Sequence, residues 1–77
     1  MNRELIIEHY TNELVRLHKS LRTAPYELIK EYERAIICLT DGFLEAVDYD
    51  EECLETLEEL VRKKLYKNSW QYKIIMI

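Results

Sequence analysis

Apolar residues recur at steps of three and four through the first half of the chain, in two consecutive stretches. This spacing places them on one side of an α-helix. The first stretch predicts a helix over about residues 2–21 with Asn2 as its N-cap, and the second predicts a helix over about residues 25–47. Joined by a short turn, two such helices form an antiparallel hairpin. The two apolar stripes are Ile7, Tyr10, Leu14, Leu17 and Leu21, then Ile29, Tyr32, Ile36, Leu39, Phe43 and Ala46.

The single proline and the single glycine of the chain both bear on the second helix. Pro25 suits a first helical turn, and Thr23 just before it can accept hydrogen bonds from the exposed backbone N–H groups. The connection between the helices is therefore predicted at residues 22–24. Gly42 either marks a turn or lies within the helix, at a cost of about 1 kcal/mol relative to alanine. Because the apolar stripe stays in phase beyond Gly42, we favour a continuous helix.

A third helix is predicted over about residues 49–67. Asp48 precedes it, and Glu51 three positions later completes the pattern of a capping box. Acidic residues near its start and basic residues near its end suit the helix dipole. The predicted fold is thus all-α, an antiparallel helical hairpin plus a third helix in one bundle-like domain over residues 1–77. The apolar stripe of the third helix is Leu54, Leu57, Val61 and Leu65.

The apolar tail at residues 69–77 does not fit one periodicity. Its apolar residues alternate as in a strand, yet some also recur as on a helical face. An isolated strand has no partner in an all-α chain, so we predict a tail docked on the bundle or on a neighbouring chain. The residues predicted to make these dimer or tail contacts are Tyr66, Trp70, Tyr72, Ile74 and Ile77.

The size and composition of the chain favour self-association. A domain of 77 residues buries only about 60% of its unfolded surface, which leaves its stability marginal. Hydrophobic residues make up 48% of the chain and tyrosine occurs six times, so another copy is expected to cover part of this apolar surface. We therefore expect a homodimer.

Charge is divided unevenly along the chain, whose net charge is −4. Nine carboxylates and no Lys or Arg lie between Asp41 and Leu60, and five positive charges without an acid follow. The simplest interpretation is a solvated helix face with favourable capping. The functional hypothesis is a regulator or inhibitor whose acidic helical face binds a protein partner. That face comprises Asp41, Glu45, Asp48, Asp50, Glu51, Glu52 and Glu55.

The basic end of the third helix suggests an alternative, a small nucleic-acid-binding or transcription-associated factor. Five charges without arginine clustering make this the weaker hypothesis, and the acidic net charge argues against duplex DNA or an anionic membrane as the main partner. The candidate contacts are Arg62, Lys63, Lys64, Lys67 and Lys73.

The two cysteines lie in apolar stretches without a metal-binding spacing. We therefore predict that Cys38 and Cys53 are buried thiols in the reducing cytoplasm, with a disulfide between them as the less favoured alternative. The N-terminal apolar run is too short for a signal sequence or a membrane span.

No catalytic, cofactor or metal motif is predicted. His9 and Glu13 lie one helical turn apart, but no further ligands complete a site. The acidic stretch from Asp48 resembles a calcium loop only superficially, because Cys53 stands where that loop needs glycine. We therefore expect neither enzymatic activity nor a cofactor.

Overall fold

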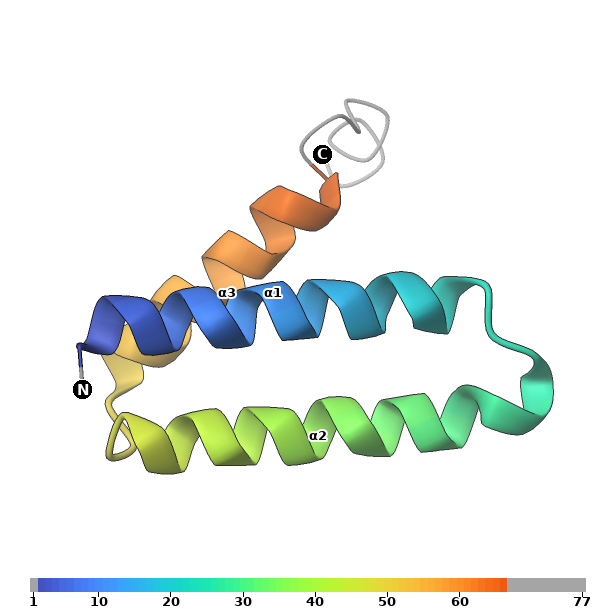
Figure 1. The fold of residues 1–77 in the computed structure, drawn as a ribbon, viewed down its shortest axis with the longest axis horizontal. Helices are drawn as coiled ribbons and strands as arrows, with labels where there is room; N and C mark the ends of the chain where they lie inside the picture. The colour runs from blue at the N-terminus through green and yellow to red at the C-terminus, as the bar shows by residue number, and fades with distance from the viewer. Residues whose placement is uncertain (1, 67–77) are drawn as a thin grey trace.

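The computed structural model describes residues 2–66, which form a helical fold (Figure 1). Helix α1 spans Arg3–Arg22, the short 3-10 helix η1 spans Tyr26–Leu28, α2 spans Ile29–Ala46 and α3 spans Glu51–Tyr66. No strand occurs in this part of the chain. The predicted all-α class is confirmed.

Helix α1 is the central element. Helices α1 and α2 lie side by side and antiparallel, while α3 starts near the beginning of α1 and crosses it at an angle (Figure 1). Helix α1 packs against both other helices, whereas α2 and α3 make far fewer contacts with each other than either makes with α1. A gap bounded by side chains of all three helices therefore remains between α2 and α3.

The hydrophobic core is concentrated where the three helices converge. Phe43, at the centre, is 0% exposed, and the ring of Tyr10 meets it edge-on at 5.4 Å between centroids. No side chain is buried between Arg16 and Gly42, so half-buried contacts alone hold the far half of the hairpin. The buried apolar side chains are Ile6, Leu14, Val15, Phe43, Val47, Cys53, Leu57 and Val61.

Two local predictions about the hairpin are confirmed. Asn2 caps α1, because its side-chain Oδ1 accepts a hydrogen bond from the backbone N–H of Glu4 at 2.8 Å. Gly42 lies inside α2, and a Cβ built at this position would stand 3.5 Å from the hydroxyl oxygen of Tyr10, at ordinary contact distance. The helix continues through Gly42 because apolar residues of its inward side occur in the chain both before and after this glycine.

The predicted start of the second helix is wrong. Pro25 has an extended backbone with φ −60° and ψ 151°, and η1 intervenes before α2 begins at Ile29. Thr23 terminates α1 instead of capping α2, since its hydroxyl donates back to the carbonyl oxygen of Ser20 at 3.5 Å. The connection is longer than predicted because Pro25 supports the 3-10 turn and not the α-helix itself.

The predicted N-cap of the third helix is also wrong by two residues. Asp50 caps α3, because its Oδ1 accepts a hydrogen bond from the backbone N–H of Glu52 at 2.9 Å. Asp48 lies in the preceding turn with a left-handed backbone, a conformation that an N-cap does not have. Both aspartates fit the composition of a helix start, and the turn geometry selects the later one.

The cysteine prediction is correct for Cys53, which is buried, and wrong for Cys38, which is exposed. Both are free thiols, so the alternative disulfide is absent. Five consecutive apolar residues at 35–39 surround α2 on every side, and the structure turns Ile37 and Cys38 outward. The predicted tail at 69–77 and its contacts lie outside the described residues, as do Lys67 and Lys73.

Candidate functional site

The connection between α2 and α3 is a tight, strained turn. The backbone N–H of Tyr49 donates to the carbonyl of Leu44 at 2.7 Å, and that of Asp48 donates to Glu45 at 3.2 Å. This pair of bonds is a Schellman motif, which normally has glycine at the position of Asp48. Asp48 and Tyr49 have φ values of 57° and 58°, a left-handed conformation that is costly for residues with a Cβ. The turn therefore holds Tyr49 in a defined place, 64% exposed.

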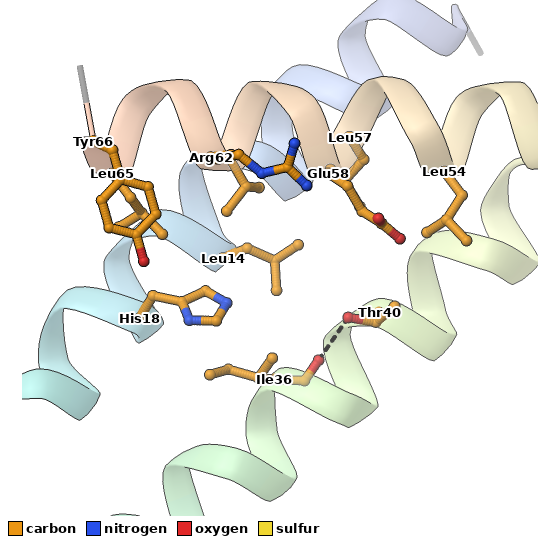
Figure 2. A pocket seen from close by; sticks show the side chains of 11 residues that line it. Leu14, His18, Ile36, Thr40, Leu54, Leu57, Glu58, Arg62, Leu65 and Tyr66 are labelled. Carbon is orange, nitrogen blue, oxygen red and sulfur yellow. Dashed lines mark hydrogen bonds between the residues drawn. The ribbon is translucent and has the colours of Figure 1, made fainter. Parts of the chain in front are cut away.

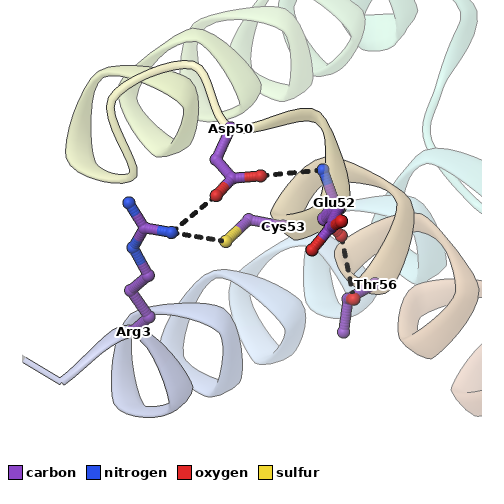
Figure 3. Close-up of polar contacts among 5 residues, drawn as sticks. All are labelled: Arg3, Asp50, Glu52, Cys53 and Thr56. Carbon is purple, nitrogen blue, oxygen red and sulfur yellow. Dashed lines mark hydrogen bonds and ion pairs between the residues drawn. The ribbon is translucent and has the colours of Figure 1, made fainter.

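Asp50 belongs to the structural framework of this turn. Its Oδ2 accepts a hydrogen bond from Nη1 of Arg3 at 2.6 Å while its Oδ1 caps α3 (Figure 3). The same Nη1 lies 3.9 Å from the sulfur of Cys53. The hydrogen bond from Arg3, followed by that from the backbone of Glu52, lowers the pKa of Asp50. Of the predicted acidic face, Asp50 is thus already engaged by the fold.

The other six predicted acidic residues are exposed and flank this turn in the sequence, three on each side of Asp50, and we call this set the acidic corner. None of them forms an ion pair with another residue of the described segment. The exposed Tyr49 lies in the chain between the α2 and α3 members of the set. The acidic corner consists of Asp41, Glu45, Asp48, Glu51, Glu52 and Glu55.

The described basic residues at the end of α3 do not gather on one face. Lys63 pairs with Glu59 on its own helix at 3.2 Å, and Lys64 donates to Oδ1 of Asn12 on α1 at 2.8 Å. Arg62 lines the space between α2 and α3. Consecutive residues of a helix are rotated by about 100° about its axis, so the side chains of these three cations point in different directions and have different neighbours.

A second feature is an open groove of about 380 Å³ between α2 and α3, which we call the three-helix groove (Figure 2). Its apolar lining comes from all three helices, and its polar residues include His18, Thr40, Glu58 and Arg62. The Thr40 hydroxyl is satisfied by the carbonyl of Ile36 at 2.9 Å. The apolar lining residues are Leu14, Ile36, Leu54, Leu57, Val61 and Leu65.

His18 and Tyr66 are at one end of the three-helix groove. Partial burial, and secondarily the charge of Arg22, lower the pKa of His18. The guanidinium carbon of Arg22 lies 5.1 Å from the ring centroid of Tyr66, within cation–π range. The last described residue of α3 therefore belongs to the lining of the groove.

Neither Tyr49 nor the groove was predicted from the sequence. Tyr49 follows a position that glycine usually occupies in this motif, so composition alone does not indicate its left-handed turn. The groove depends on the angle at which α3 crosses α1. The only available signal was the apolar run at residues 35–39, which exceeds what one helix–helix contact buries.

Three further observations bear on function. Within residues 2–66, no three His, Cys, Asp or Glu side chains come close enough together to hold a metal ion. None of the helices described here is both long and apolar enough to cross a membrane. Comparisons with protein-family models, with curated proteins and with solved structures find no match.

Proposed function

We propose that this protein is a non-enzymatic interaction module, a small regulator or inhibitor, that binds a basic surface of another protein through the acidic corner. One observation carries the proposal: Tyr49 is exposed on a strained, hydrogen-bonded turn, and six exposed carboxylates flank it in the sequence. Backbone strain in proteins concentrates at functional positions. An exposed aromatic residue on a constrained backbone, flanked by charged residues, has the composition of an interface anchor and its rim.

The acidic corner and Tyr49 would have different roles in binding. Exposed carboxylates steer a basic partner and raise the association rate, an effect that weakens with salt. Tyr49 would then be buried at the centre, where its ring face attracts an arginine guanidinium. Because the turn already holds its backbone, little conformational entropy is lost on binding.

The test compares two exposed tyrosines. The tagged protein is used to capture a partner from a lysate of its source, the partner is identified, and its affinity for three variants is measured by titration. Tyr49→Ala should weaken binding at least tenfold, and so should the combined reversal of Glu51, Glu52 and Glu55 to lysine. Tyr26→Ala is the matched control, since Tyr26 is 87% exposed on η1, away from the acidic corner. Equal affinities of the Tyr49 and Tyr26 variants would refute the proposal.

Self-association in the cytoplasm is the second part of the proposal. The outward side of α2 exposes Ile37 to 61% and carries the thiol of Cys38, and apolar surface of this kind supports a contact with a second copy. Free thiols suit a reducing compartment. Analytical ultracentrifugation should find a dimer that Ile37→Asn converts to a monomer. A monomeric wild-type chain at micromolar concentrations would contradict this part.

The nucleic-acid alternative has less support, because Arg62, Lys63 and Lys64 have separate local surroundings. It predicts binding to duplex or single-stranded probes that falls steeply with salt. A gel shift at low salt that disappears in the Lys63→Glu and Lys64→Glu variants would favour it over the protein-binding role.

A further inference from the structure

We propose that a hollow between α1 and α3 binds a primary ammonium group carried on an aliphatic chain. This α1–α3 hollow is open and has a volume of about 320 Å³, at the low end of the range for ligand pockets, roughly 300–1,000 Å³. It shares no lining residue with the three-helix groove or with the acidic corner. Its lining includes Glu4, Ile7, Glu8 and Thr11 of α1 and Leu60 and Lys64 of α3.

A buried hydroxyl provides the first argument for a ligand. Thr11 is 1% exposed, and its Oγ1 has no hydrogen-bond partner within the described residues. Thr56, the other threonine of the hollow, donates to the carbonyl oxygen of Glu52 at 2.9 Å. Buried polar groups are nearly always hydrogen-bonded, so a ligand in the hollow would supply the partner that Thr11 lacks. Rotamer changes in the half-buried lining, which are common on binding, give such a ligand access.

Two carboxylates indicate the charge of the ligand. Glu4 and Glu8 are one helical turn apart, on the side of α1 that carries Thr11. Neither forms an ion pair with a cation of the described segment. Glu4 lies in the first turn, where the helix dipole favours an acid, whereas Glu8 lies beyond that turn. The two carboxylates and the hydroxyl are hydrogen-bond acceptors on one side of the helix, and a primary ammonium has three N–H donors to match them.

The rest of the lining suits an aliphatic chain. Ile7 and Leu60 are half-buried and provide apolar surface beside the acceptors. The methylene stem of an alkylamine covers such surface while its charged end stays among polar groups. The ammonium of Lys64 does not fill this role, because it donates to Oδ1 of Asn12 at 2.8 Å.

The first test titrates n-pentylammonium into the isotope-labelled full-length protein and follows the backbone amides by NMR. We expect saturable shifts concentrated at residues 4–11 and 56–64, with a dissociation constant of the order of millimolar for so small a ligand. The uncharged n-pentanol should bind about tenfold more weakly, because it cannot form charge-assisted hydrogen bonds. Equal binding of the alcohol would overturn the proposal. Shifts confined to residues 41–55 would also overturn it, since the acidic corner would then merely attract cations.

A second arm distinguishes the two sources of such a group. Tighter binding of n-pentylammonium than of Nα-acetyl-lysine N-methylamide would support the proposal for a free amine. The reverse order, with shifts at the same residues, would support it for a lysine side chain of a protein.

Variants of the two threonines test the hydroxyl. Thr11→Val should weaken binding of n-pentylammonium about tenfold, because it removes a buried acceptor while nearly keeping the shape of the side chain. Thr11→Ser keeps the hydroxyl and should retain the affinity within about twofold. Thr56→Val is the matched control, since the fold already engages that hydroxyl. Unchanged affinity in Thr11→Val, or equal losses in the two valine variants, would overturn the proposal.

Variants of two glutamates test the charge. Glu8→Gln should weaken binding about tenfold, whereas Glu33→Gln, the same change at an exposed position of α2, should leave the affinity unchanged. Equal effects of the two changes would mean that only the net charge matters and would overturn the proposal. These titrations do not involve the partner of the acidic corner, so their failure leaves the proposed function intact, and the reverse also holds.

Discussion

Asp48 is the position where glycine should be more stable than alanine. Its φ of 57° costs a residue with a Cβ roughly 1–2 kcal/mol. Glycine avoids that cost but loses about 0.4–1 kcal/mol through its greater freedom in the unfolded chain. Asp48→Gly should therefore be more stable than Asp48→Ala by about 0.8 kcal/mol. Both variants remove the same charge, so their difference isolates the backbone conformation.

The matched control is Asp41, an exposed aspartate within α2. There alanine should be more stable than glycine by about 1 kcal/mol, because glycine is unfavourable in a helix interior. Urea unfolding followed by circular dichroism gives the free energy of unfolding of all four variants. In a thermal melt of a domain of this size, a difference of 1 kcal/mol corresponds to a shift in melting temperature of roughly 4–8 °C. If glycine is no better than alanine at residue 48, the left-handed turn is not a source of strain and the explanation is refuted.

Three further predictions concern the core and the groove. Phe43→Ala should lower the free energy of unfolding by about 3–5 kcal/mol, which is about the whole stability of so small a domain. A variant that still melts cooperatively at the wild-type temperature would contradict this. Thr11 is 1% exposed, and its hydroxyl has no hydrogen-bond partner within the described residues. In urea unfolding, Thr11→Val should therefore be more stable than the wild type by about 1 kcal/mol, and Thr11→Ser should not. A less stable valine variant would show that the hydroxyl is satisfied. The pKa of His18 is lowered from 6.5 in the folded state, so the unfolded state binds the proton more readily and stability should fall as pH drops below about 6.5. Between pH 7.5 and 5, the melting temperature of His18→Gln should change less than that of His9→Gln, the control at an exposed histidine. Equal changes in the two variants would contradict the role of His18.

Local sequence information was sufficient for the helices themselves. The stripes of apolar residues, the cap at Asn2 and the continuity of α2 through Gly42 depend on neighbours within one or two turns. Where two local signals competed, the prediction was wrong by a few residues, as for Asp48 against Asp50 and for Pro25. The physical reason is that composition identifies a residue suited to a cap but not the backbone angle at which the chain arrives there.

The tertiary structure decided which of the predicted acidic and apolar residues remain free of contacts within the fold. Asp50 was one of seven equivalent carboxylates in the sequence, and only its contact with Arg3, 47 positions away, removes it from that set. Likewise, the crossing of α3 over α1 opens the groove and leaves Ile37 outside the core while Ile36 lines the groove. Periodicity determines that a helix has an apolar side, whereas the angle between helices determines how much of that side is covered.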